Sequence, residues 1–274
     1  MSYIHAIILA IIEGLTEFLP VSSTGHMVLA SSIMGIEKSE FTKLFEVVIQ
    51  FGAILAIVVL YWKRFFQDFD FYLKLLVAFI PAAVLGATFY KHIKQVMGSP
   101  LTIAVVLLIG GIIMLFVDKM FERNESFSPA SQKMDYKKAL TIGGFQVLAM
   151  IFPGLSRSAA TIFGGLTQGL NRQRAAEFSF FLAVPTMAAA SLKESYEYYK
   201  NVKIGAEGFH ALTGSEIGML AMGNIVAFIV AMIAVRTFIN FFTERGFKIF
   251  GYYRIALSLL VLLLWYSGFK MFVD

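Results

Sequence analysis

Two short polar clusters interrupt apolar stretches of this sequence. The first, EGLTEFLPVSSTGH, covers residues 13–26, and the second, FPGLSRSAAT, covers residues 152–161. Carboxylates, hydroxyls, an imidazole and a guanidinium cost free energy to bury in apolar surroundings, so they are kept there for binding or chemistry. Pro20 and Pro153 each break a helical pattern in the middle of a cluster. The clusters are therefore the candidates for a functional site.

The first cluster contains two acidic residues. Glu13 and Glu17 are four residues apart and share one face of a helix. Two carboxylates in a medium of low dielectric constant do not both stay ionised without a compensating cation. We therefore expect Glu13 and Glu17 to hold a divalent metal ion, Mg or Ca, or to share a proton.

Three hydroxyl residues follow Pro20. Ser22, Ser23 and Thr24 occupy the expected N-cap and first turn of a new helix, where free backbone N–H groups favour an anion. His26 lies within one helical turn of both serines, where it could activate a serine nucleophile or protonate a leaving phosphate. The alternatives are simple helix capping for the serines and a structural role for the histidine.

The second cluster is a break followed by another helix start. The guanidinium of Arg157 needs an anionic partner in an apolar region, and its planar fork suits phosphate oxygens. Gly154 would allow close backbone approach, and Ser156, Ser158 and Thr161 supply further hydrogen-bond donors. The alternative partner for Arg157 is one of four acidic residues: Glu13, Glu17, Glu46 or Glu177.

Composition places both clusters in a membrane protein. The 274 residues are 58% hydrophobic and 15% charged, with a mean hydropathy of +0.74, whereas soluble domains have about 25% charged residues. The absence of cysteine excludes thiolate metal sites, and the net charge of +5 lacks the basic block typical of nucleic-acid binding. We predict an all-α polytopic protein, one domain over residues 1–274, with six membrane spans: Phe41–Trp62, Tyr72–Tyr90, Leu101–Val117, Ala175–Leu192, Ile217–Val235 and Ile249–Trp265.

The two clusters lie in regions too long for one span and broken in the middle. Each half of Ile4–Met34 and of Ala139–Leu170 is only about 12–15 residues long, too short to cross the bilayer. We expect two re-entrant helix pairs that meet at a wet cavity, with a proline-kinked span as the alternative.

The two broken regions also resemble each other at an offset of 133 residues, with Pro20 matching Pro153 and Ser23 matching Ser156. This predicts an inverted repeat, residues 1–118 and 136–274, joined by a polar loop at 119–135. On that topology eleven Lys and Arg residues flank the spans on one side and six on the other. The positive-inside rule then places the first pair on the outer side.

Both clusters resemble the signatures of a known family, the bacterial undecaprenyl-pyrophosphate phosphatases of the bacitracin-resistance type. Residues 13–26 are similar to the first signature, and PGLSRS with Thr161 is similar to the second. The Ile80-Pro81-Ala82 turn, AEFSF at 176–180 and AVP at 183–185 also fit. The resemblance therefore covers nearly the whole chain.

The resemblance implies hydrolysis of undecaprenyl (C55 polyprenyl) pyrophosphate to its monophosphate and inorganic phosphate, with a divalent metal. The reaction would lie on the outer side of the bacterial inner membrane, recycle the lipid carrier of peptidoglycan synthesis and confer bacitracin resistance. It implies Ser23 as nucleophile, His26 as its acid–base partner, and Glu13 and Glu17 in metal binding or catalysis. Its other functional positions are Ser22, Ser156, Arg157, Ser158 and Thr161. A homodimer is compatible with these features.

Two other functions use similar residues. An inverted-repeat transporter or flippase for a polyprenyl phosphate or another phosphate-bearing lipid would use the same anion site. It would not require an acidic pair beside a serine and a histidine, so we favour the enzyme. Lipid phosphatases of the acid-phosphatase type need a second histidine soon after the arginine, but the next one is His210. That family is not supported.

Overall fold

A computed structural model describes the chain except residues 66–68, 98–99, 127, 129–130 and 268–274. Its described residues form α-helices and one 3-10 helix, and six helical segments are long and apolar enough to cross a membrane. The six predicted spans are therefore confirmed. They are α3 and α4 together (Glu40–Val48 and Gln50–Leu60), α6 (Phe69–Met97), α7 (Pro100–Met120), α10 (Arg172–Lys203), α11 (Gly214–Arg245) and α12 (Lys248–Tyr266).

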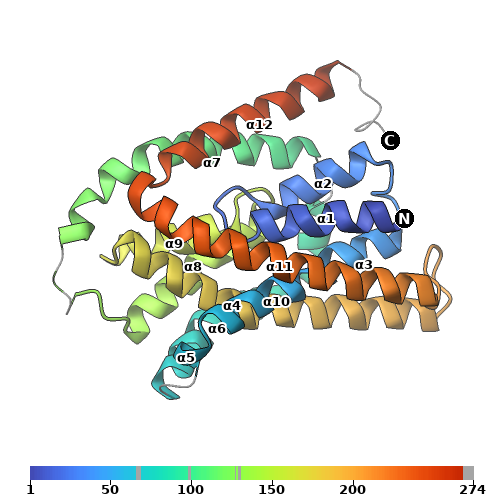
Figure 1. Cartoon of the computed structure of the whole chain (residues 1–274), viewed down its shortest axis with the longest axis horizontal. Coiled ribbons are helices and arrows are strands. Elements are labelled where there is room, and N and C mark those ends of the chain that lie inside the picture. Colours follow the sequence, from blue (N-terminus) through green and yellow to red (C-terminus); the bar gives the residue numbers. More distant parts are fainter. Residues whose placement is uncertain (66–68, 98–99, 127, 129–130, 268–274) are drawn as a thin grey trace.

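The two broken regions form two pairs of short helices: α1 (Tyr3–Thr16) with α2 (Ser23–Ile33), and α8 (Tyr136–Ile151) with α9 (Arg157–Thr167). An 11-residue helix is about 16 Å long, roughly half of the hydrocarbon thickness. Figure 1 shows that the helices of each pair lie next to each other in the middle of the molecule. Each pair enters the bundle and returns, as expected for re-entrant helices and unlike a kinked span.

The pairs enter from opposite ends of the bundle. The hydroxyl of Tyr3 donates to the carbonyl of Ser215, so α1 begins at the end that carries the α10–α11 connection, the loop end. Asn124 donates to the carbonyls of Leu166 and Leu170, so α9 returns to the end that carries the turn between α11 and α12, the turn end. In Figure 1 the loop end is on the right and the turn end on the left.

The turn end is fixed by polar contacts. Gly246 ends α11 with a φ of 67°, a conformation that favours glycine. The carboxylate of Asp118 accepts from the backbone N–H groups of Phe247 and Lys248, and it pairs with Arg172 at 3.1 Å. The predicted loop at 119–135 begins here with the 3-10 helix η1 (Glu122–Ser126), and its residues 127 and 129–130 lie outside the described part.

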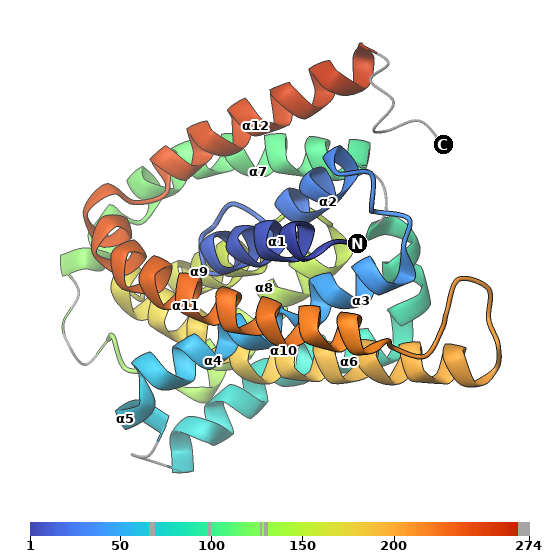
Figure 2. The same cartoon turned by 45° about the vertical axis from the view of Figure 1, so that its right-hand side comes forward.

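Phenylalanine rings fill the core between the short pairs and the spans. Phe18 lies in the break between α1 and α2 and contacts Phe180 of α10 edge to face, at 5.3 Å between ring centroids. Phe180 in turn contacts Phe238 of α11. Figure 2 shows α7 and α12 packed side by side on one flank of this core. Such ring contacts hold the first break against α10 and α11.

Candidate active site

Both short pairs break with the same local backbone. Ser22 caps α2 with a φ of 69°, and Ser156 caps α9 with a φ of 76°. Each serine hydroxyl accepts at 3.3 Å from a backbone N–H three residues on, that of Gly25 or of Ala159. A serine in this strained conformation persists where the surroundings fix it. The two breaks therefore present two helix N-termini in equivalent conformations.

The equivalence of the caps corrects the predicted residue matching. The cap follows the proline by two residues in the first break and by three in the second, so the offset changes from 133 at Pro20 to 134 at the caps. Ser22, not Ser23, is the counterpart of Ser156. Ser23 and Arg157 are the first residues of α2 and α9 and hold the same position in the two pairs.

Glu17 joins these two positions. The hydroxyl of Ser23 donates to Oε2 of Glu17 at 2.5 Å, and Nη2 of Arg157 donates to Oε1 of the same carboxylate at 3.3 Å. Nη1 of Arg157 donates to the backbone carbonyl of Ser179 at 3.0 Å. The ion pair that was the alternative for Arg157 is thus formed with Glu17. One buried carboxylate connects the hydroxyl of one pair to the guanidinium of the other.

Glu13 lies one helical turn before Glu17 and is fully buried. Neither of its carboxylate oxygens accepts a hydrogen bond from a donor among the described residues. One carboxylate oxygen of Glu46 also has no hydrogen-bond partner there. The carboxyl group of Glu17 is a neighbour of that of Glu13, as expected for residues four apart on one helix face. Glu46 of α3, one of the four acidic residues considered as a partner for Arg157, is partly buried.

The acidic pair Glu13 and Glu17 is compatible with a magnesium ion. Within the described residues no three His, Asp or Glu side chains are grouped as a metal site. Mg²⁺, however, is commonly bound through one or two carboxylates together with substrate phosphates. Glu13, whose oxygens accept from no donor among the described residues, and the neighbouring Glu17 supply two such carboxylates.

His26 is placed differently from its predicted pairing with Ser23. Its Nδ1 lies 2.8 Å from the carbonyl of Ser22, and its Nε2 lies 2.6 Å from the hydroxyl of Tyr253. A carbonyl only accepts, so Nδ1 carries the proton and Nε2 accepts from Tyr253. Because Ser23 begins α2, its hydroxyl points across the break to Glu17 instead of along the helix to His26.

The other predicted hydroxyl residues fix the second break. Ser158 donates to the carbonyl of Leu19 at 2.8 Å and contacts the Ser156 hydroxyl at 3.0 Å. Thr161 donates to the carbonyl of Arg157 at 2.8 Å, and its hydroxyl lies 2.6 Å from that of Ser179. Thr24 is partly exposed in the first turn of α2. Phosphate binding by these residues stays a prediction.

Arg254 of α12 is a residue that the sequence analysis missed. It is fully buried and donates to the carbonyls of Gly154 and Leu155 at 2.8 Å and of Pro20 at 3.3 Å. One side chain therefore supplies donors to both breaks. The signal was present in the sequence, since an arginine inside a predicted span is costly and marks a specific role.

Two glycines make room for this arrangement. A Cβ atom at Gly110 of α7 would lie 2.6 Å from Nη2 of Arg254. Gly154 has a φ of 95°, and a Cβ there would lie 2.8 Å from the carbonyl oxygen of Ile103. The close backbone approach predicted for Gly154 is therefore made to α7, where it brings the carbonyl of Gly154 to Arg254.

Comparison with known proteins agrees with these motifs. The family model of the bacitracin resistance protein BacA matches residues 6–260. The undecaprenyl-diphosphatase of Flavobacterium psychrophilum is 59% identical over 264 residues, which are 96% of either chain. Those of Bdellovibrio bacteriovorus and Aquifex aeolicus are 52% and 42% identical and cover 98% of either chain. The resemblance found in the sequence is confirmed, and the chain belongs to the bacitracin resistance protein BacA family.

Proposed function

We propose that this chain is an undecaprenyl-diphosphatase, which hydrolyses undecaprenyl pyrophosphate to the monophosphate and inorganic phosphate. Full-length relatives at 59% and 52% identity carry that name. The structural observation that supports it most strongly is the Glu17 carboxylate between the Ser23 hydroxyl and the Arg157 guanidinium. A base (Glu17), a nucleophile (Ser23) and a cation (Arg157) are therefore in direct contact. In the cell this activity would recycle the lipid carrier of peptidoglycan synthesis and confer bacitracin resistance.

The geometry suggests the order of bond changes. Oγ of Ser23 attacks the terminal phosphorus, its proton passes to Glu17, and the anhydride bond to the undecaprenyl phosphate breaks. Water then hydrolyses the phosphoserine and releases inorganic phosphate. Arg157 and the free N–H groups at the starts of α2 and α9 stabilise negative charge on the transferred phosphoryl group. His26, whose Nε2 faces Tyr253 as a proton acceptor, takes a proton from the water that hydrolyses the phosphoserine.

Replacing Ser23 with alanine tests this assignment. We expect phosphate release from undecaprenyl diphosphate, measured with purified protein in detergent, to fall roughly 100-fold, because water attacks less readily than the positioned hydroxyl. The matched control is Ser126→Ala, which removes an exposed hydroxyl at the turn end. Acid quenching followed by peptide mass spectrometry should find phosphate on Ser23. Release by Ser23→Ala at the parent rate would contradict the assignment.

We also propose that Glu13 and Glu17 hold a divalent cation, Mg or Ca, when substrate is bound. Such an ion would neutralise charge on the diphosphate oxygens. We expect EDTA to abolish phosphate release and added Mg²⁺ to restore it. Glu13→Gln should raise the Mg²⁺ concentration for half-maximal activity by roughly tenfold, because removing one carboxylate weakens hard-cation binding. Full activity in EDTA would exclude the metal.

We propose that the turn end faces the cytoplasm and that the pyrophosphate enters from the outer side. The excess of Lys and Arg at the turn end supports this orientation. The chain has no cysteine, so a single cysteine can report on topology. In intact cells an impermeant maleimide should label Gly205→Cys at the loop end and spare Lys137→Cys at the turn end. The reverse pattern would place the turn end outside.

The entry of the two short pairs from opposite ends also suits a transporter. Hydrolysis by purified protein in detergent, where no second compartment exists, separates the two functions. Absence of phosphate release from the parent protein would favour transport of a phosphate-bearing lipid. The homodimer compatible with the sequence stays a prediction.

A further inference from the structure

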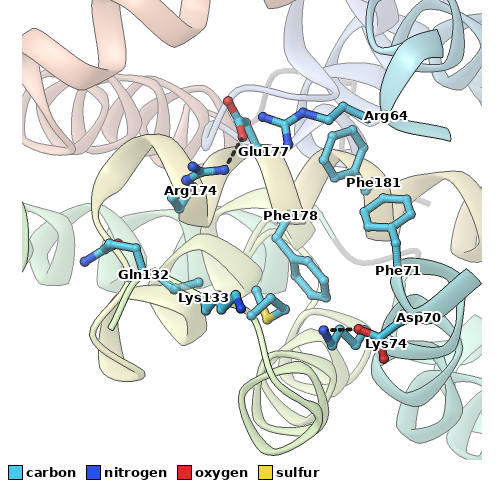
Figure 3. A pocket seen from close by; sticks show the side chains of 12 residues that line it. Arg64, Asp70, Phe71, Lys74, Gln132, Lys133, Arg174, Glu177, Phe178 and Phe181 are labelled. Carbon is cyan, nitrogen blue, oxygen red and sulfur yellow. Dashed lines mark hydrogen bonds and ion pairs between the residues drawn. The ribbon is translucent and has the colours of Figure 1, made fainter. Parts of the chain in front are cut away.

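A cavity of about 300 Å³ lies at the turn end, away from the α1–α2 break. The short helix α5 (Trp62–Phe65), the start of α6, the segment before α8 and the first turns of α10 enclose it (Figure 3). Its cationic lining residues are Arg64, Lys74, Lys133 and Arg174. None of these residues contributes to the site around Glu17.

Positive charge exceeds negative charge in this cavity. Asp70 and Glu177 are its acidic lining residues. Lys74 forms an ion pair with Asp70, and Arg174 forms one with Glu177 at 3.8 Å. Figure 3 shows these two ion pairs on opposite sides of the cavity. Within the described part of the chain, Arg64 and Lys133 take part in no ion pair. The lining residues therefore carry two positive charges in excess, which suits a phosphate group.

The rest of the cavity wall is aromatic. The ring of Phe181 contacts that of Phe71 edge to face at 5.1 Å between centroids, and Phe178 lines the cavity beside them. Figure 3 shows these three rings between the Lys74–Asp70 ion pair and the Arg174–Glu177 ion pair. A ligand held here thus meets cations at its head and apolar ring faces along its body.

The cavity lies at the depth of lipid headgroups. Trp62, next to Arg64, is 55% exposed, and Tyr72, close to Lys74, is 43% exposed. Exposed Trp and Tyr residues at the ends of spanning helices mark the membrane–water interface. Basic pockets at this level bind the headgroups of anionic lipids.

The cavity and the candidate active site are separated by α10. The carbonyl of Ser179 accepts from Arg157 on the active-site side, whereas Glu177 and Phe178 of the same helix line the cavity. The side chain of Arg157 is 13% exposed and is bound to Glu17 and Ser179, so it does not serve the cavity. The two anion-binding regions are therefore distinct.

We propose that this cavity is a second phosphate-binding site, which takes the headgroup of a prenyl monophosphate or another phosphate-bearing lipid at the turn end. The phosphate lies between Arg64 and Lys133, and the first part of the hydrocarbon chain lies against Phe71 and Phe178. Binding here requires no bond cleavage and does not depend on the hydrolytic function of the Glu17 site.

Photoaffinity labelling tests the proposal. Purified full-length protein in detergent is irradiated with a diazirine-bearing farnesyl monophosphate, and the labelled peptides are identified by mass spectrometry. We expect label on the start of α6 or of α10, separately from label on the active-site peptides. The double substitution Arg64→Gln and Lys133→Gln should reduce the cavity label at least tenfold. The matched control, Lys63→Gln with Lys137→Gln, removes two lysines at the same end that do not line the cavity and should leave the label unchanged.

Competition separates the sources of the phosphate group. Unlabelled farnesyl phosphate or phosphatidylglycerol should displace the cavity label, whereas farnesol should not. If inorganic phosphate displaces the label at the same concentration, the site binds a free ion and not a lipid, and the proposal is overturned. Equal loss of label in both double variants would also overturn it. Phosphate release and a thermal unfolding midpoint close to those of the parent protein show that a variant is folded. If the double variant is unfolded, the single variant Arg64→Gln provides the test.

Discussion

Replacing Glu17 with glutamine is expected to lower the kcat of undecaprenyl-diphosphate hydrolysis by roughly 1000-fold, as for loss of a positioned base. Glutamine has nearly the same shape and can still contact Ser23 and Arg157. Its amide does not take the serine proton and does not neutralise the guanidinium. The KM should change by less than the kcat, because Arg157 and the helix N-termini remain to bind the diphosphate.

Two further variants sharpen this prediction. Glu17→Asp keeps a carboxylate but shortens its reach, so it should recover part of the lost kcat. Glu207→Gln removes an exposed carboxylate from the α10–α11 connection and should be neutral. Parental kcat in Glu17→Gln would show that Ser23 has another base. A large rise in KM at constant kcat would assign Glu17 to substrate binding through Arg157.

Replacing Arg254 with methionine is expected to destabilise the protein by about 3–5 kcal/mol, because several buried backbone carbonyls lose their donor. The side chain donates to the carbonyls of Pro20, Gly154 and Leu155, and more weakly to that of Leu107 at 3.4 Å. Among the described residues, no backbone N–H group donates to the carbonyls of Pro20, Gly154 and Leu155. A buried carbonyl left without a donor costs about 1–3 kcal/mol.

The measurement is the thermal unfolding midpoint in detergent, followed by phosphate release at a temperature where the variant is folded. Arg254→Lys should be intermediate, because an ammonium group donates to fewer of these carbonyls at once. Arg236→Met removes an exposed arginine from α11 and is the matched control. If Arg254→Met unfolds at the parent midpoint, the breaks are held by other contacts, such as that of Ser158 with Leu19.

Arg157 and Arg254 have different roles at the breaks. Arg157 forms its ion pair with Glu17 and lies 6.0 Å from the centre of the Phe18 ring. Arg254 bonds only to backbone carbonyls among the described residues. We therefore expect substitutions of Arg157 to act mainly on the reaction and those of Arg254 mainly on the position of both breaks.

The sequence by itself determined the six spans and the positions of both breaks. Hydropathy and length decide which stretches cross the membrane, and a proline followed by a capping serine stops one helix and starts the next. The signatures around Glu17 and Arg157 also identified the family, since they are contiguous in the chain. All of these properties depend on residues that are near neighbours in the sequence.

Only the tertiary structure decided which polar groups meet. Ser23 faces Glu17 instead of His26, Tyr253 faces His26, and Arg254 bonds to both breaks. Each contact joins helices whose relative rotation is set by packing, through the close approach at Gly110 and the rings around Phe18. A buried polar group must find a partner, but its residue type does not say which partner packing will bring near. For that reason the residue types of the site were predictable from the sequence, whereas the contacts between them were not.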